Sequence, residues 1–278
     1  MMAMKRMKLF RLALATAVAM PLLCLSPADS PDPGQFFKTL SAHDPAQSYP
    51  SYDRLLQVVD QIQAMAETTL TAALPDLFAA LQSPDDAIAV DAAFALTAVA
   101  GRPDSNELLR SHLSEINALL GRSDRRLKAT VPTVFLRMQP APREAVPRLA
   151  NFLTRNDQSS DAKPDAVFAL IKLAPNDPAA IAAIRHFIGL PLDRQTRIDT
   201  INALGSSHLT DGGLLDLLAR QLADPDQNVR LAAIQTMNRI GRPAVQHASA
   251  ALTRLANDPA ESLQIRQQAQ HALALMPQ

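Results

Sequence analysis

The residue types that most often do chemistry are few and scattered in this chain of 278 residues. Its six histidines form neither a His-x-x-x-His pair nor a His-Glu-x-x-His motif, the spacings that place two metal ligands on one helix face. A Gly-x-Ser-x-Gly nucleophile turn is absent as well. The single cysteine, Cys24, cannot form an internal disulfide or a cysteine-based zinc site. We therefore expect no metal site, no cofactor and no catalytic residue.

The N-terminus has the layout of a bacterial secretory signal. Residues 1–11 contain four basic and no acidic side chains, and an apolar run follows over residues 12–24. The small residues Ser26 and Ala28 suit cleavage after Ala28. We expect residues 1–28 to be a signal peptide and the chain to be exported, so that it is periplasmic or associated with the cell envelope.

Two features refine this expectation. Cys24 follows Leu23, which is bulky where lipoprotein signals have Gly or Ala, so lipid anchoring at Cys24 is not favoured. Residues 29–52 contain four prolines among Asp, Ser and Gln, which is typical of an extended tether. Without residues 1–28 the chain has 23 basic and 27 acidic side chains and no Trp. A mildly acidic chain of this kind does not fit a nucleic-acid partner.

Residues 53–278 carry a repeat with helical periodicity. No segment alternates apolar and polar residues as a half-buried strand would. The clearer copies have apolar positions four, eight and about eleven residues after position zero, two copies are weaker, and the copies follow one another at steps of 33 to 39 residues. A second helical segment precedes each copy. The sequence therefore predicts an all-α fold, an α-solenoid of about six stacked helical hairpins. The zero positions are Ile88, Leu127, Ala162, Thr196, Val229 and Ile265.

The repeat resembles the HEAT-repeat family. Residues 229–241 resemble the second helix of that repeat, and residues 73–77 and 145–149 resemble its first helix, including the proline. The resemblance implies an armadillo-like α-solenoid over most of the mature chain. Pro132, Thr196 and Thr200 depart from the apolar pattern, so bending or looser packing is expected there.

The resemblance also implies a ladder of basic residues between repeats. In the family a basic residue after position zero often pairs with an Asp in a neighbouring turn. Here that position is basic in five of six copies. The basic residues are Lys128, Lys163, Arg197, Arg230 and Arg266, and the expected partners are Asp193, Asp224 and Asp258.

Three further positions of the second helix point away from its apolar stripe. If the second helices line an inner curve, their side chains face a groove suited to binding a peptide or protein. The alternative is that the two Phe pack between adjacent repeats and the charges are only solvated. These side chains are Asp91, Asp165 and Asp199, then Phe94 and Phe168, then Arg137, Lys172 and Arg239.

Charge is unevenly distributed along the chain. Residues 29–91 contain ten acidic and two basic side chains, whereas residues 120–155 contain two acidic and eight basic ones. A basic patch formed by the second segment could bind an acidic protein, an anionic lipid surface or a polyanionic sugar. The alternative is pairing with the acidic segment of the same chain or of a second copy. The candidate patch residues are Arg122, Arg125, Arg126 and Arg143.

Together these patterns predict a non-catalytic scaffold or adaptor of the bacterial cell envelope. It would hold a protein partner in the solenoid groove or at the basic patch. The alternative is an envelope enzyme, a hydrolase or lyase, with a composite site assembled from scattered Asp and His side chains.

Overall fold

The computed structural model describes residues 52–276 except 156–159 and 207–210. All of these residues belong to one structural unit. The signal peptide expected over residues 1–28 lies outside the described residues, as does the tether expected over 29–52 apart from Tyr52, where the first described helix begins. Every regular element in the described part is helical, which confirms the predicted all-α class.

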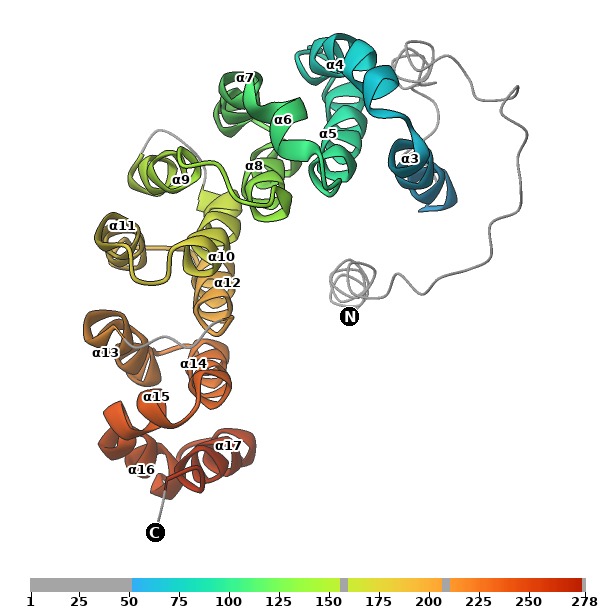
Figure 1. The fold of residues 1–278 in the computed structure, drawn as a ribbon. Helices are drawn as coiled ribbons and strands as arrows, with labels where there is room; N and C mark the ends of the chain where they lie inside the picture. Colours follow the sequence, from blue (N-terminus) through green and yellow to red (C-terminus); the bar gives the residue numbers. More distant parts are fainter. Residues whose placement is uncertain (1–51, 156–159, 207–210, 277–278) are drawn as a thin grey trace. The chain divides into compact units, whose positions relative to one another are not determined.

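The described helices form two layers (Figure 1). In the second layer each helix packs on the next one of that layer along the chain. The second-layer helices are α3 (Tyr52–Ala64), α5 (Asp86–Ala100), α8 (Arg125–Arg137), α10 (Lys163–Leu173), α12 (Arg194–Leu204), α14 (Gln227–Ile240) and α17 (Leu263–Leu273).

The first layer supplies the other half of each helix pair. Two of its members are broken into two short helices, which the sequence pattern did not predict. The first-layer helices are α4 (Glu67–Leu81), α6 (Ser105–Arg110) with α7 (Leu113–Ala118), α9 (Ala145–Thr154), α11 (Pro178–Ile188), α13 (Gly212–Arg220), and α15 (Arg242–His247) with α16 (Ser249–Asn257). Short 3-10 turns at η2 (Leu119–Gly121), η3 (Ser160–Ala162) and η4 (Gln221–Ala223) lead towards α8, α10 and α14.

The helix pairs confirm the six predicted copies of the repeat. The apolar stripe residues Leu96, Phe135 and Leu170 are fully buried in α5, α8 and α10. Each such side chain contributes about 1.5–3 kcal/mol through burial, and repeats of this kind bury a continuous core by stacking on their neighbours. None of the helices within the described ranges is both long and apolar enough to cross a membrane.

Aspartates fix where most second-layer helices begin. The carboxylates of Asp85, Asp124, Asp193 and Asp226 accept hydrogen bonds from backbone N–H groups in the first turns of α5, α8, α12 and α14. These bonds satisfy N–H groups that have no partner inside the helix. Helix α10 begins differently, with Ala162 at the cap position and Pro164 in its first turn.

The residues that depart from the apolar pattern are accommodated in the core. Helix α8 continues through Pro132, which is buried. The Thr196 hydroxyl donates to Asp193 at 2.6 Å, and the buried Thr200 hydroxyl donates to the Thr196 carbonyl at 2.7 Å. Because both hydroxyl groups are hydrogen-bonded, burying them costs little. Gly241 ends α14 at a φ of 91°, a conformation that favours glycine.

Candidate functional site

Phe168 on α10 is an exposed aromatic residue in the middle of the stack. Its exposed fraction is 38%, and among the described residues only Leu263 and Leu275 are further large apolar side chains with this degree of exposure. Leu263 begins α17 and Leu275 follows it, whereas Phe168 lies well inside its helix. An exposed aromatic ring on a packed helix is a suitable anchor for a protein partner.

Charged side chains lie on both sides of Phe168 along α10. Asp165, which precedes it by one turn, forms a 3.6 Å ion pair with Arg125 of α8. Lys172, which follows it by one turn, places its Nζ atom 5.8 Å from the centroid of the Phe168 ring. The same Nζ atom donates a hydrogen bond to the carbonyl of Ser206, just after α12. The exposed ring is therefore flanked by an acidic and a basic residue, each bonded to an adjacent helix pair.

Asp199 extends this surface onto α12, which packs against α10. It occupies on α12 the position that Asp165 occupies on α10. Its carboxylate accepts a 3.1 Å hydrogen bond from Gln195 Nε2, and no cationic side chain in the described ranges pairs with it. We define the α10 face as Asp165, Phe168, Lys172 and Asp199.

The equivalent residues of α5 do not form a matching surface. The Asp91 side chain is buried, with an exposed fraction of 8%, and Phe94 is half-buried. The expectation that Asp91 faces an open groove is therefore wrong.

The basic residues expected near the C-terminal ends of the second-layer helices join adjacent repeats. Arg137 at the end of α8 donates from Nη1 to the Thr97 carbonyl of α5 at 3.2 Å. Its guanidinium lies against Gly101, where an added Cβ would be 3.0 Å from Nη1. Burial lowers the pKa of Arg137 below its ordinary value. The Arg137 side chain therefore binds the carboxyl end of α5, where the helix dipole favours a cation.

The same arrangement recurs at α12. Arg239 of α14 donates to Asn202 Oδ1 at 2.9 Å and lies over Gly205, the residue that ends α12. Lys172 reaches the same end of α12 from the other side, through the Ser206 carbonyl. Sequence periodicity placed these cations on the outward face, but it could not show that their charged groups are engaged by neighbouring helices.

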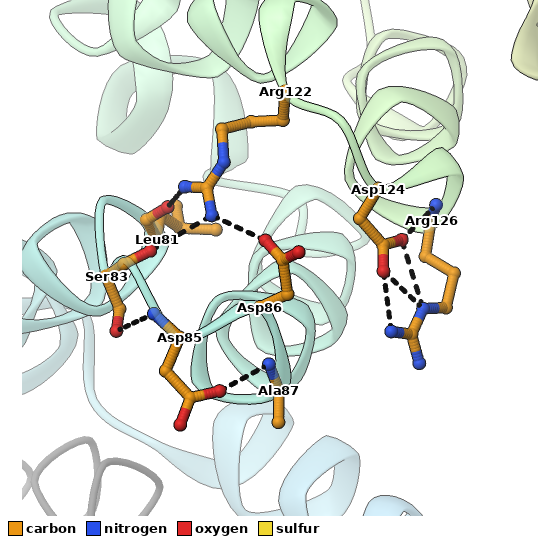
Figure 2. Close-up of polar contacts among 8 residues, drawn as sticks. All are labelled: Leu81, Ser83, Asp85, Asp86, Ala87, Arg122, Asp124 and Arg126. Atoms are coloured by element: carbon orange, nitrogen blue, oxygen red, sulfur yellow. Dashed lines mark hydrogen bonds and ion pairs between the residues drawn. The ribbon is translucent and has the colours of Figure 1, made fainter. Parts of the chain in front are cut away.

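The first residue of the expected basic patch, Arg122, is also used inside the chain (Figure 2). Its guanidinium donates to the carbonyls of Leu81 and Ser83 at 3.1 and 3.0 Å, and pairs with the Asp86 carboxylate at 2.8 Å. Leu81 ends α4 and Asp86 begins α5. Arg122 therefore closes the turn of the preceding repeat.

The other three patch residues are all exposed, and two of them are bonded within the chain. Arg126 pairs with Asp124 at 2.6 Å, and this hydrogen bonding lowers the pKa of the Asp124 carboxyl. Arg125 contacts the next repeat through Asp165. Arg143 is exposed in the loop between α8 and α9. Because three of the four arginines have partners in the chain, much of the local positive charge is already compensated.

The expected ladder of ion pairs is confirmed at Arg197 and shifted at Arg230. Arg197 pairs with Asp224 of the next turn, as predicted. Arg230 pairs instead with Glu261 at 2.7 Å, which lies three residues beyond the expected Asp258. Asp193 forms no ion pair with a basic side chain in the described part of the chain, and its carboxylate accepts hydrogen bonds from the start of α12.

Lys163 occupies the same ladder position in α10 and is almost completely buried. Its Nζ atom donates to the carbonyls of Leu153 and Arg155 at the end of α9. It also lies 5.9 and 5.5 Å from the centroids of the Phe152 and Phe187 rings. Carbonyl oxygens and aromatic faces together compensate the buried charge.

The histidines in the described ranges belong to different elements, His112 just before α7, His186 in α11, His247 in α15 and His271 in α17. His112 stacks on Phe78 with ring centroids 4.1 Å apart, and His247 lies 2.6 Å from Asp216. Across those ranges no three His, Cys, Asp or Glu side chains are grouped so that they could hold a metal ion.

Comparison with known proteins supports a repeat relationship for the C-terminal part. Residues 191–274, which contain α12 to α17, match the family described as HEAT repeats. No curated protein matches the chain. An engineered protein of known structure is 20% identical over 88% of this chain and 68% of its own, with a TM-score of 0.42. A designed armadillo repeat protein is 20% identical over 87% of this chain and 98% of its own, with a TM-score of 0.36.

Proposed function

We propose that this chain is a non-catalytic scaffold of the bacterial cell envelope that holds a protein partner on its α10 face. The observation that carries the proposal is the exposed Phe168 ring, flanked by Asp165 and Lys172 on a helix packed on both sides. A stack of helix pairs presents such a surface already ordered. Binding then costs little conformational entropy of the scaffold itself.

The proposal assigns export to the N-terminal part. Residues 1–28 act as the signal peptide, residues 29–52 as a tether and residues 53–278 as the binding stack. The support is the run of basic residues followed by a short apolar segment and small residues up to Ala28. Expression of the full chain with a C-terminal tag in a bacterium tests this. We expect the tagged protein in the periplasmic fraction with Asp29 as its first residue, and an uncleaved cytosolic product would contradict export.

The binding proposal is tested by capturing partners of the tagged full chain from the envelope fraction. Phe168→Ala should reduce recovery of a specific partner, because the ring is its anchor. Leu263→Ala is the matched control, since Leu263 is also an exposed apolar residue, at 62%, but lies on α17. Equal recovery with the Phe168→Ala variant and the unchanged protein would overturn the α10 face as the binding surface.

A further inference from the structure

Helix α17 has an accessible side formed by residues one helical turn apart. We propose that this side docks an acidic helix of a second protein, which runs parallel to α17 and places a carboxylate on Arg266. We define the α17 stripe as Leu263, Arg266, Gln267 and Gln270, which share one side of the helix. The stripe lies on a different helix pair from the α10 face, so it is a second binding surface of the chain.

Arginines join consecutive second-layer helices at the ends where these helices begin. Arg197 of α12 pairs with Asp224, and Arg230 of α14 pairs with Glu261 at 2.7 Å. Each carboxylate lies in the turn before the next second-layer helix, α14 or α17. Because these helices also pack on one another, they run in the same direction with their first turns side by side. A helix docked on α17 in the same way presents a carboxylate at its own start.

Arg266 has the same position on α17 but lacks a carboxylate partner. It is half-buried, its Nε atom is shielded from solvent without a hydrogen-bond partner, and no carboxylate within the described ranges pairs with it. A partly desolvated guanidinium without a counterion is unfavourable, so a carboxylate from outside is stabilising there. Arg230 shows the paired arrangement, in which its side chain and that of Glu261 are 16% and 10% exposed.

The middle of the stripe occupies positions that pack on a helix in the preceding repeat. The equivalents of Gln267 and Gln270 in α14 are Leu231, which packs against the core, and Ile234, which is fully buried. Helix α14 packs on the second-layer helices α12 and α17, whereas α17 packs on α14 and on α16 of the first layer. These positions therefore face the following second-layer helix, and on α17 they are exposed.

The side chains of the stripe define the chemistry of the partner. Leu263 precedes Arg266 by one turn and is 62% exposed, the highest value among the large apolar side chains of the described part. Gln267 and Gln270 present amides where α14 has aliphatic side chains. The complementary helix has an acidic residue in its first turn, where the helix dipole favours it, an apolar residue beside it and polar residues beyond. A symmetric contact between two α17 stripes has no carboxylate to offer Arg266.

Binding of helical peptides to the purified full chain tests the proposal. The first probe is a fluorescent, hydrocarbon-stapled peptide with Asp-Glu at its start and Leu and Gln along one side. The second probe has the two acids at its end, and the third has Asn-Gln in their place. Circular dichroism establishes that the three are equally helical. Fluorescence anisotropy should show the first peptide binding at least about 3-fold more tightly than both others, with an affinity that falls as salt rises.

Two variants locate the contact. Arg266→Gln should weaken binding of the first peptide by about 3- to 10-fold, because a charge-assisted hydrogen bond is lost. Its Tm should stay unchanged, since Arg266 forms no ion pair within the described part of the chain. Arg242→Gln is the matched control, because Arg242 is an exposed arginine on α15 of the first layer and its replacement removes the same charge. This control should leave the affinity unchanged.

The proposal is overturned if the three peptides bind equally, if Arg266→Gln weakens binding no more than Arg242→Gln, or if no peptide binds below about 1 mM. It is also overturned if sedimentation shows that the protein alone associates through Arg266, because the stripe then binds a second copy of this chain. Each of these results leaves partner capture through Phe168 untouched, so the proposed function is tested separately.

Discussion

Helices α5 and α10 contain nearly the same string of residues and present different surfaces. The strings run from Asp91 to Leu96 and from Asp165 to Leu170 and differ at one position, where α5 has Ala93 and α10 has Val167. In α5 the aspartate is buried and the phenylalanine half-buried, whereas in α10 the aspartate is half-exposed and the phenylalanine exposed. Leu96 and Leu170 are both fully buried.

The difference comes from what surrounds each string. Both helices pack against one first-layer helix and two second-layer helices, α5 against α4, α3 and α8 and α10 against α9, α8 and α12. Helix α5 carries the small residues Ala89 and Ala98 where α10 has Lys163 and Lys172. Small residues let neighbouring helices approach closely, whereas Lys163 extends to a carbonyl of α9 in its own helix pair and Lys172 to the Ser206 carbonyl just after α12. A periodic string therefore fixes which residue faces the core, but neighbours decide whether the opposite face is open.

The largest expected effect concerns Lys163, whose equivalent in α5 is Ala89. Lys163→Ala should lower the free energy of unfolding by about 2–4 kcal/mol, because it leaves two carbonyls of the α9 end without their donor and opens space between Phe152 and Phe187. Urea denaturation followed by circular dichroism measures this. Lys172→Ala is the control, with an expected loss below about 1 kcal/mol because Lys172 is exposed. Equal losses would contradict the distinction.

Replacing the aspartate should cost more stability in the α5 string than in the α10 string. Asp91→Ala should cost about 1–3 kcal/mol of stability, because it removes a buried carboxylate and leaves its interaction partner unsatisfied. Asp165→Ala should cost less than about 1 kcal/mol, because its ion pair with Arg125 is partly solvated. Thermal denaturation of both variants makes the comparison, and a larger loss for Asp165→Ala would show that burial does not separate the strings.

The phenylalanines should separate stability from binding. Phe94→Ala should cost about 1–2 kcal/mol of stability through lost burial, with partner capture unchanged. Phe168→Ala should cost less stability but reduce partner capture. Denaturation and capture measured on the same two variants test this pair of expectations. If Phe94→Ala reduced partner capture and Phe168→Ala did not, the binding surface would lie on α5 and not on α10.

The smallest effect concerns how α10 and its neighbour α12 begin. Hydrogen bonds from the hydroxyl and backbone N–H of Thr196 lower the pKa of Asp193 below 3.8. The ionised carboxylate therefore stabilises α12 at pH values above the ordinary pKa of an aspartate. This stabilisation is lost as the pH falls through the lowered pKa of Asp193. Asp193→Ala should cost about 1 kcal/mol at neutral pH and progressively less in acid. Helix α10 starts at Ala162 without such a cap. A loss of stability from Asp193→Ala that stays constant across the pH range would contradict this origin.

The sequence predicted the helices of the fold more completely than it predicted which of their faces are accessible. Apolar spacing located all six helix pairs, because burial of the stripe is a local property of each helix. The division of α6 from α7 and of α15 from α16 was missed, since the apolar spacing runs on across Ser111 and Ala248.

The candidate site was predicted only in its choice of positions. Asp165, Phe168 and Asp199 lie on an accessible face, but Asp91 does not. The cations Arg122 and Arg137 bond to backbone carbonyls of the preceding repeat. Such partners are more than thirty residues away along the chain, and no charge pattern marks a carbonyl as an acceptor.

The central claim is that Phe168, and not Phe94, faces the partner. Replacement of each phenylalanine in turn by photoreactive p-benzoylphenylalanine, in the full chain expressed in a bacterium, tests it. On illumination, a crosslink to another protein is expected from position 168 and none from position 94. Crosslinks from position 94 alone, or equally from both, would contradict the account.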